Sequence, residues 1–344
     1  GGTSIMAIID KPSDYFNTVL YTGNGASSRA ISVGFQSDWV WNKPRTNTND
    51  YQLVDSVRGG GKVISSNLAD AEYTAGNTIL SFGSDGFTCG NGASVNANGV
   101  TYASWNWVAG GSASNNTDGN TTTSVSVNQD AGFSIMKYAG DGNDSTIGHG
   151  LGAKPEYIIF KEIDGAESWR VWSKYTPDTA SKALALNLTD AAFSQSGWIG
   201  AISTSTISIG TDSSINTNGN NYIAYAFSPK QGYSKFGAYT GNGNADGTFV
   251  YTGFKPAFLM VKSTGSGGWL INDTKRSPHN ITGLTLYADS SASEESYTIG
   301  ASEWDFLSNG FKNRDAGSAQ NTSGTSYIYM AFAENPFVAS NFVP

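Results

Sequence analysis

Turns rich in Gly, Asn and Asp hold the first candidates for chemistry in this chain of 344 residues. Residues 140–144 (Gly-Asp-Gly-Asn-Asp) and 242–247 (Asn-Gly-Asn-Ala-Asp-Gly) place oxygen-bearing side chains at alternate positions, as calcium-binding loops do. The second turn begins like an EF-hand loop, but Gly253 stands at the twelfth position, where a bidentate Glu would be needed. Backbone geometry explains both turns better, because tight turns require these residue types. We therefore expect no metal site and no cofactor.

The histidines and acids of the chain form no recognisable catalytic set. His149 and His279 are the only histidines, and no Cys or second His lies at a metal-ligand spacing from either. Glycoside cleavage would instead need two carboxyl groups about 5–10 Å apart across a sugar cleft. The sequence pairs no acids in this way, and the acids that could serve fall in expected loops: Glu162, Asp164, Glu167, Glu294 and Glu295. We expect a protein that is not an enzyme, with a glycan-cleaving domain as one alternative.

Tryptophans are the stronger candidates for binding, because an exposed indole can stack on a sugar ring. Trp169 and Trp269 lie in related sequence frames, which favours a shared role in the core. Trp198 lies in Ser-Gly-Trp-Ile-Gly and has no clear counterpart elsewhere in the chain. It is the residue that we predict to make an exposed contact with a glycan.

Three sequence anchors recur in the same order and indicate a repeated unit. The first is a Tyr before a Gly-Asn-Gly or Gly-Asp-Gly turn, and the second is an apolar strand that ends in Lys. The third is an Asn-Gly or Ser-Gly turn before a strand with another Tyr, 81, 84 or 88 residues after the first. A Tyr beside a turn can bury its ring and bond its hydroxyl to a loop, so we interpret these tyrosines as structural anchors. They are Tyr21 and Tyr102, Tyr138 and Tyr222, and Tyr239 and Tyr327.

The elements that carry these anchors are predicted to be short strands. Aromatic and β-branched residues alternate with period two, and turn signals fall every eight to twelve residues or so, a pattern typical of antiparallel sandwiches. We predict an all-β fold of three tandem antiparallel β-sandwich (jelly-roll-like) modules, of which the first is the most freely attached. The expected parts are a lead-in at 1–20, a module at 21–110, a flexible linker rich in Ser, Thr, Asn and Gly at 111–132, modules at 133–231 and 232–337, and a tail at 338–344.

Composition narrows the class of protein further. Charged residues make up only 14% of the chain, and the net charge is -8, so the basic stripe that nucleic acid requires is missing. Cys89 is the single cysteine, which excludes an intrachain disulfide. No apolar run reaches the roughly eighteen residues that span a membrane, so we expect no membrane insertion.

Three long segments of the chain are distinctive: residues 232–243 (Gly-Tyr-Ser-Lys-Phe-Gly-Ala-Tyr-Thr-Gly-Asn-Gly), 251–258 (Tyr-Thr-Gly-Phe-Lys-Pro-Ala-Phe) and 327–337 (Tyr-Ile-Tyr-Met-Ala-Phe-Ala-Glu-Asn-Pro-Phe). They resemble the repeat units of tail-fibre-like structural proteins from marine bacteriophages. The resemblance implies a protein of the virion surface that contributes to host attachment, with a capsid decoration or head fibre as the alternative. By analogy with fibres it also implies a homo-oligomer, expected to be a trimer. The implied partners are other virion proteins and a host cell-surface glycan or protein.

Overall fold

The protein folds almost entirely into antiparallel β-sheet. The computed structural model describes residues 9, 11–178, 181–296, 303–316 and 320–333. Within these residues, the 3₁₀ turn η1 (Pro12–Asp14) and the single helical turn α1 (Ser213–Asn216) are the elements that are not strands. The predicted all-β, antiparallel, sandwich-like fold is confirmed. No helix in the described part of the chain is long and apolar enough to cross a membrane.

The N-terminal third of the chain forms a large and a small sheet that pack against each other. The large sheet has the order β1 (Phe16–Thr22), β9 (Thr101–Trp107), β3 (Trp39–Pro44) and β4 (Gln52–Asp55). The small sheet has the order β2 (Arg29–Ser32), β8 (Gly86–Cys89) and β7 (Ile79–Gly83), and β5 (Lys62–Val63) pairs with β6 (Tyr73–Thr74). Apolar residues such as Ile31, Val40 and Phe87 fill the space between the two sheets. We call this pair of sheets the first unit.

The same arrangement follows in the second unit. Its large sheet has the order β10 (Ser114–Asn116), β11 (Thr123–Asn128), β12 (Phe133–Ala139), β20 (Asn221–Phe227), β14 (Tyr157–Glu162) and β15 (Arg170–Ser173). Its small sheet has the order β13 (Ser145–Gly148), β19 (Thr206–Ile209) and β18 (Ile199–Ile202), and β16 (Lys182–Ala183) pairs with β17 (Phe193–Ser194).

A third unit completes the described chain. Its large sheet has the order β21 (Ser234–Thr240), β29 (Ser326–Ala333), β23 (Pro256–Ser263), β24 (Trp269–Asp273), β25 (Leu284–Tyr287) and β26 (Glu295–Ser296). Its small sheet has the order β22 (Phe249–Tyr251), β28 (Gly310–Asn313) and β27 (Trp304–Leu307). The central strand order of the large sheet, and the order of the small sheet, are thus equivalent in all three units.

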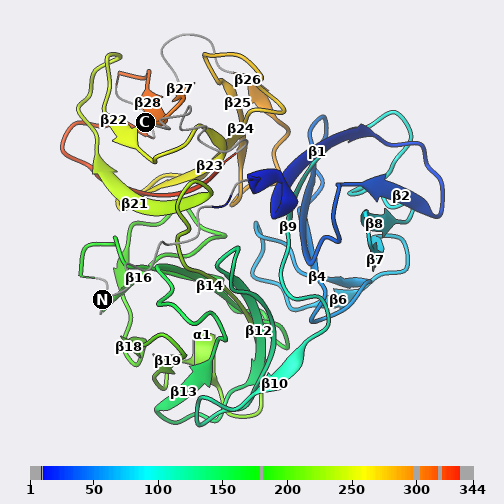
Figure 1. Cartoon of the computed structure of the whole chain (residues 1–344), viewed down its shortest axis with the longest axis vertical. Coiled ribbons are helices and arrows are strands. Elements are labelled where there is room, and N and C mark those ends of the chain that lie inside the picture. The colour runs from blue at the N-terminus through cyan, green and yellow to red at the C-terminus, as the bar shows by residue number, and fades with distance from the viewer. Residues whose placement is uncertain (1–8, 10, 179–180, 297–302, 317–319, 334–344) are drawn as a thin grey trace, which may run out of the picture.

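The three units share one aromatic core. Figure 1 shows them as lobes around a common centre, which the inner faces of the large sheets enclose. The ring of Trp39 in the first unit stacks on Tyr225 of the second unit with 4.2 Å between centroids. Phe332 of the third unit lies 5.6 Å from Trp107 and 5.9 Å from Phe227. The expectation that the first module is more freely attached was therefore wrong, since removing any unit would expose this core.

The segment expected to be a flexible linker, 111–132, is instead partly strand. Both β10 and β11 lie within it and extend the second large sheet beyond β12, with β10 as the edge strand. Thr123, Val125 and Ser126 are buried, so this Ser- and Thr-rich segment is packed into the second unit. At the start of the segment, the Asp38 carboxylate accepts hydrogen bonds from the backbone N–H groups of Ala109 and Gly111.

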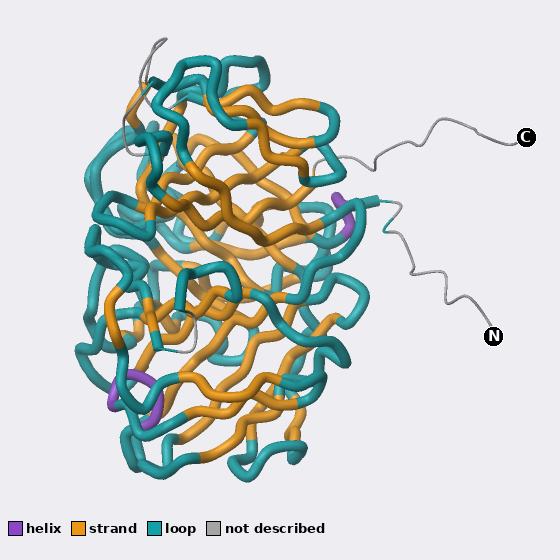
Figure 2. The backbone as a smooth tube through the Cα atoms, turned by 90° about the vertical axis from the view of Figure 1, so that its left-hand side faces the viewer, coloured by secondary structure: helices purple, strands orange, loops and turns teal. Residues whose placement is uncertain are grey.

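The described chain begins and ends on one side of the molecule. The expected lead-in, 1–20, already contains η1 and most of β1, while the expected tail at 338–344 lies outside the described residues. The Tyr15 ring before β1 lies 5.8 Å from the ring of Tyr233, whose backbone bonds to Ala333 at the end of β29. In Figure 2 this side, marked by η1, lies opposite α1 and the first-anchor turn that α1 contacts.

Candidate functional site

The six anchor tyrosines form three equivalent stacked pairs. Each first-anchor Tyr lies directly across the sheet from the third-anchor Tyr of its own unit. The two rings are stacked, with centroids 5.0, 5.3 and 5.0 Å apart in the first, second and third unit. The pairs are Tyr21 with Tyr102, Tyr138 with Tyr222, and Tyr239 with Tyr327.

The hydroxyl groups of these tyrosines hold the loop that closes each unit. Tyr21, Tyr138 and Tyr239 donate to backbone carbonyls at Val95, Ile215 and Gln320, over 2.7 to 2.8 Å. The third-anchor hydroxyls accept a backbone N–H from the same loop. Burial raises the pKa of Tyr138 and Tyr239 well above the ordinary value, so both remain neutral donors at physiological pH. These hydrogen bonds give the six tyrosines a structural role, since their hydroxyl groups hold the closing loop of each unit.

A buried Asn in each unit completes the frame and was missed in the sequence. The side chains of Asn96, Asn216 and Asn321 accept the backbone N–H of the middle residue of each first-anchor turn. Their amide groups donate to carbonyls further along the same turn. All three lie six residues before the third-anchor Tyr, and this constant spacing could have identified them.

Hydrogen bonds between units form a closed ring around the shared core. We call the contact between two units a seam. The indole N–H of Trp169 donates to the carbonyl of Ser65 in the first unit, over 2.9 Å. In the same way, Trp269 donates to Ala185 in the second unit. Tyr51 occupies the equivalent position in the first unit, and its hydroxyl donates to Tyr287 of the third unit over 2.9 Å.

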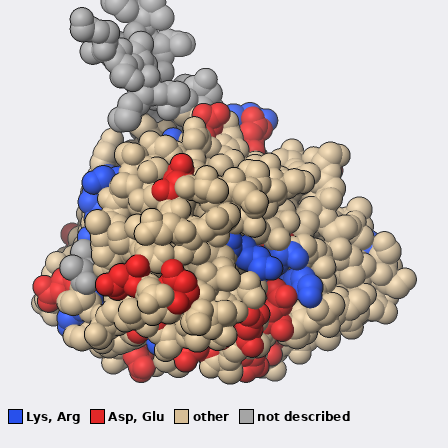
Figure 3. Space-filling view, turned by 90° about the horizontal axis from the view of Figure 1, so that it is seen from below, with Lys and Arg blue, Asp and Glu red and all other residues tan. Residues whose placement is uncertain are grey.

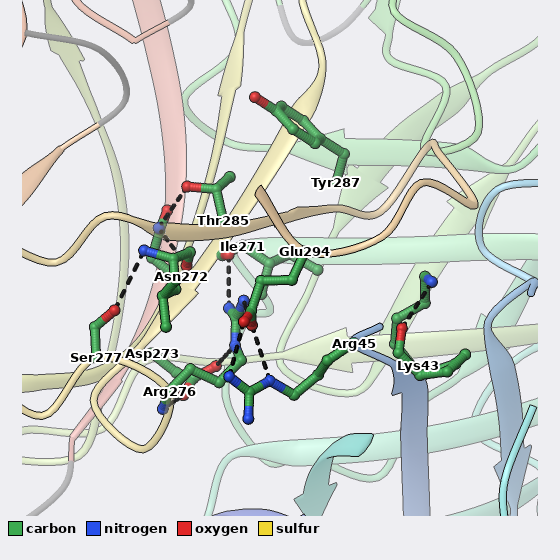
Figure 4. A network of polar contacts seen from close by, with 12 residues as sticks. Lys43, Arg45, Ile271, Asn272, Asp273, Arg276, Ser277, Thr285, Tyr287 and Glu294 are labelled. Carbon is green, nitrogen blue, oxygen red and sulfur yellow. Dashed lines mark hydrogen bonds and ion pairs between the residues drawn. The ribbon is translucent and has the colours of Figure 1, made fainter. Parts of the chain in front are cut away.

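The seam between the third and first units contains a buried network of ion pairs (Figure 4). The Arg276 guanidinium donates to Asp273 over 2.6 Å and to Glu294 over 3.1 Å. Glu294 also accepts two hydrogen bonds from Arg45 of the first unit. The Trp105 indole N–H, again from the first unit, donates to Asp273 over 3.1 Å. Arg276 is completely buried, and its pKa is raised because the favourable field of the two carboxylates outweighs the cost of burial.

The first–second seam repeats this network, and the second–third seam lacks it. In the first unit, Arg58 pairs with Asp55 and Glu72, and Tyr225 of the second unit donates to Asp55 over 2.8 Å. The sheet register, together with spacing along the chain from the paired residues, identifies the residues that replace this set at the third seam, and none of them is charged. They are Ser173, Thr176 and Ala192 of the second unit and Met330 of the third.

Three equivalent lysines end the second-anchor strands and are buried. Lys43, Lys161 and Lys262 each donate to carbonyls of the hairpin loop that follows their strand. Burial lowers the pKa of each to about 8, while nearby carboxylates act in the opposite direction. Each lysine side chain therefore stabilises its hairpin loop by hydrogen bonds to the loop carbonyls.

The other residues considered for chemistry also make structural contacts. His149 is buried, accepts the Leu151 N–H at Nδ1, and has a lowered pKa because burial disfavours its charged form. The Asp164 carboxylate accepts hydrogen bonds from Asn221, and Glu162 accepts one from Asn220. Oxygen atoms of the two candidate calcium turns accept backbone N–H groups of those turns. Within the described residues, no three His, Cys, Asp or Glu side chains gather as a metal site requires.

Trp198 is buried, so the expectation of an exposed indole was wrong. It is only 4% exposed and packs edge-on against Phe160 between the two sheets of the second unit. Gly197, with φ +64°, forms the turn that directs the chain inward at this point. Trp198 nevertheless lines a groove of about 450 Å³, together with Asn120, Asp144, Thr146, Gly200 and Ser208. Contact between Trp198 and a glycan therefore stays a prediction that depends on this groove.

The outer face of the third unit carries exposed aromatic rings that the sequence did not single out. Phe249 and Tyr251 alternate with buried Val250 along β22, and they are 43% and 59% exposed. Elsewhere much of the surface is uncharged, as on the side seen in Figure 3, in keeping with the 14% of charged residues. Alternation along β22 could have revealed this pair, since both aromatic residues fall on the face opposite the core.

Comparison with known families agrees with the extent of this fold. The model of a family described as a domain of unknown function, DUF7483, matches residues 11–336, which include all three units. A comparison with curated proteins found no match. Because the matched range covers nearly the whole chain, the chain belongs to the DUF7483 family.

Proposed function

We propose that this chain is a non-enzymatic structural protein of a bacteriophage virion, tail-fibre-like, that contributes to attachment to the host surface. The observation that carries the proposal is the contrast between the two faces of the units. Equivalent residues hold the inner faces together through one core and a closed ring of hydrogen bonds. The outer faces carry different residues in each unit, as expected of a rigid body that displays binding surfaces.

The engagement of the candidate acids supports binding rather than catalysis. Glu294 is held between two arginines, and Glu162 and Asp164 accept hydrogen bonds from neighbouring asparagines. A pair of carboxylates that cleaves a glycoside must face an open sugar cleft. Among the residues that line the groove beside Trp198, Asp144 is the one acid, so the lining does not supply a pair.

The proposal places the protein on the outside of the particle, in contact with other virion proteins and with a glycan or protein of the host cell surface. It includes a homo-oligomer, a trimer by analogy with fibres. Light scattering of the purified chain measures the number of copies. A monomer at all concentrations would remove the trimer from the proposal.

Binding of the purified, fluorescently labelled protein to host cells tests the proposed attachment. We expect saturable binding and competition with adsorption of the virus. No binding at micromolar protein would overturn the role in attachment. Reducing ends released from host envelope polysaccharide would establish the glycan-cleaving alternative, and cryo-electron microscopy of particles would distinguish a tail fibre from a capsid decoration.

A further inference from the structure

The outer face of β22 and β28 in the third unit has the form of a small aromatic platform. Phe249 and Tyr251 lie two residues apart, which separates their Cα atoms by about 7 Å along the strand. Gly310 lies directly opposite Tyr251 in the neighbouring strand. A Cβ at Gly310 would lie 2.1 Å from the Val250 carbonyl oxygen, so the close approach of the two strands requires glycine here, and 3.0 Å from the Phe249 ring. The missing side chain thus also leaves room for Phe249 to lie over the sheet.

The fold itself does not require aromatic residues at these two positions. The register with the neighbouring strand identifies the equivalent residues in the other units. Phe249 corresponds to Ala30 in the first unit and to Thr146 in the second, and Tyr251 corresponds to Ser32 and Gly148. Because both other units form the same small sheet with small residues here, the aromatic pair needs another explanation.

Charged side chains of both signs border the platform. Lys312 lies across the sheet from Phe249 and pairs with Asp246. Arg314 lies 3.8 Å from Asp246 and 3.5 Å from Asp305, so these charges largely balance.

Lys235 adds a positive charge that no described carboxylate offsets. Its ammonium group lies 5.2 Å from the centroid of the Tyr251 ring. No carboxylate in the described part of the chain lies within ion-pair distance of Lys235, unlike Lys312. The border therefore holds three cations against two carboxylates, on a protein whose net charge is -8.

We propose that this platform binds an acidic glycan, a chain of pyranose rings that carry carboxylate groups. This inference rests on the proposed role in host attachment and names the ligand for one surface. The apolar face of a sugar ring stacks on Phe249 and Tyr251. A sugar carboxylate pairs with Lys235, and sugar hydroxyls exchange hydrogen bonds with Asp305 and Arg314.

Affinity electrophoresis with polygalacturonate as the acidic probe and dextran as the neutral one tests the proposal. We expect the unmodified protein to be retarded by polygalacturonate and much less by dextran. Tyr251→Ala and Phe249→Ala should each weaken retardation about tenfold, the loss typical of a central aromatic contact. Lys235→Gln should reduce the preference for the acidic probe. Tyr73→Ala is the matched control, because Tyr73 is an exposed tyrosine on the first unit, 45% exposed.

The outcomes separate this inference from the proposed function. Equal retardation of the unmodified protein and both aromatic variants would overturn the platform as a glycan site. If labelled protein binds host cells and Tyr251→Ala binds equally well, attachment stands and the platform is wrong. Cell binding that protease treatment removes and periodate oxidation of the glycans leaves intact would also overturn it. If no variant binds cells but polygalacturonate retardation depends on Tyr251, the attachment role fails and the site stands.

Discussion

The inner and outer faces of the three units follow different rules. On the inner faces, the equivalent residues Tyr51, Trp169 and Trp269 make the same hydrogen bond across all three seams. At equivalent outer positions the residues differ in size and polarity, as Ala30 and Phe249 do. The inner faces are therefore constrained by packing around a common core, and the outer faces are free to differ in residue type.

The three seams fill equivalent buried positions in two ways, with a charged set of residues or with a neutral one. Two seams bury an Arg between two carboxylates and add a hydrogen-bond donor from the neighbouring unit. The third seam replaces every member of this set by an uncharged residue, including Met330 at the position of the donor. A buried charge is tolerated when all its partners are present, and a neutral set avoids the cost of burial altogether. A partly charged seam should be the least stable arrangement.

The largest effect is expected from breaking the charged seam at one residue. Arg276→Met keeps most of the side-chain volume but leaves Asp273 buried without its cation. We expect a loss of about 3–5 kcal/mol in the free energy of unfolding, the usual cost of an uncompensated buried charge. Equilibrium unfolding in urea measures it.

A double variant makes the same seam neutral and acts as the control. Asp273→Asn with Arg276→Met retains an acceptor for the Trp105 indole, and Glu294 keeps its pair with Arg45. The double variant should be more stable than Arg276→Met alone, because no charge is left unpaired. If the double variant loses as much free energy of unfolding as Asp273→Asn alone and Arg276→Met alone lose together, the charged set does not act as one unit.

The next largest effect contrasts two tyrosines of the third unit. Tyr239→Ala removes a ring that stacks on Tyr327 and a hydroxyl that bonds to Gln320. We expect a loss of roughly 3 kcal/mol or more, on the scale of large-to-small changes in a core. Tyr251→Ala, on the outer platform, should change the free energy of unfolding by less than about 0.5 kcal/mol. Thermal melting of both variants checks the contrast, and an equal loss would remove the distinction between the two faces.

A smaller effect tests the ring of hydrogen bonds across the seams. Tyr51→Phe removes only the hydroxyl that donates to the Tyr287 carbonyl of the third unit. Loss of one buried hydrogen bond should cost about 1 kcal/mol. Tyr251→Phe removes an exposed hydroxyl and provides the matched control. A Tyr51→Phe protein as stable in urea as this control would show that the ring adds nothing to stability.

The sequence predicts the repeat and the class of strand well, because both depend on local signals. Each strand is marked by alternation over a few residues, and each first-anchor turn by its glycines, such as Gly25 and Gly243 with positive φ. Closure around a common core depends on contacts between residues far apart in the sequence. Its signal was nevertheless present: β14 reads Tyr-Ile-Ile-Phe-Lys-Glu and is buried on both faces, as a strand is when protein covers both sides of its sheet.

Exposure was harder to predict than position. The glycines on either side of Trp198 suggested an open loop. In the structure Gly197 forms a turn and Gly200 lines the groove, while the Trp198 side chain between them is largely buried. Phe249 and Tyr251 lie between the first and second anchors of the third unit, in a segment to which the sequence patterns assigned no role. The face to which a side chain points depends on strand register, and one residue of register reverses it.

The smallest predicted effect concerns the three buried lysines, which appear in every unit. Each has a folded-state pKa of about 8, lowered by burial from 10.5. Below pH 8 both folded and unfolded states hold the proton, and the full cost of the buried charge is present. Between pH 8 and about 10.5 the unfolded state binds more protons, so the contribution of each lysine to stability rises with pH. Above pH 10 the buried tyrosines act in the opposite direction, because their raised pKa makes the unfolded state ionise first.

Urea unfolding at pH 7.5 and 8.5 tests this pH dependence with Lys161→Met. Between the two pH values, the free energy of unfolding of Lys161→Met should gain roughly 0.7 kcal/mol less than that of the unmodified protein. Identical gains in both proteins would mean that the Lys161 ammonium keeps its proton, held by the loop carbonyls of Glu162 and Gly165.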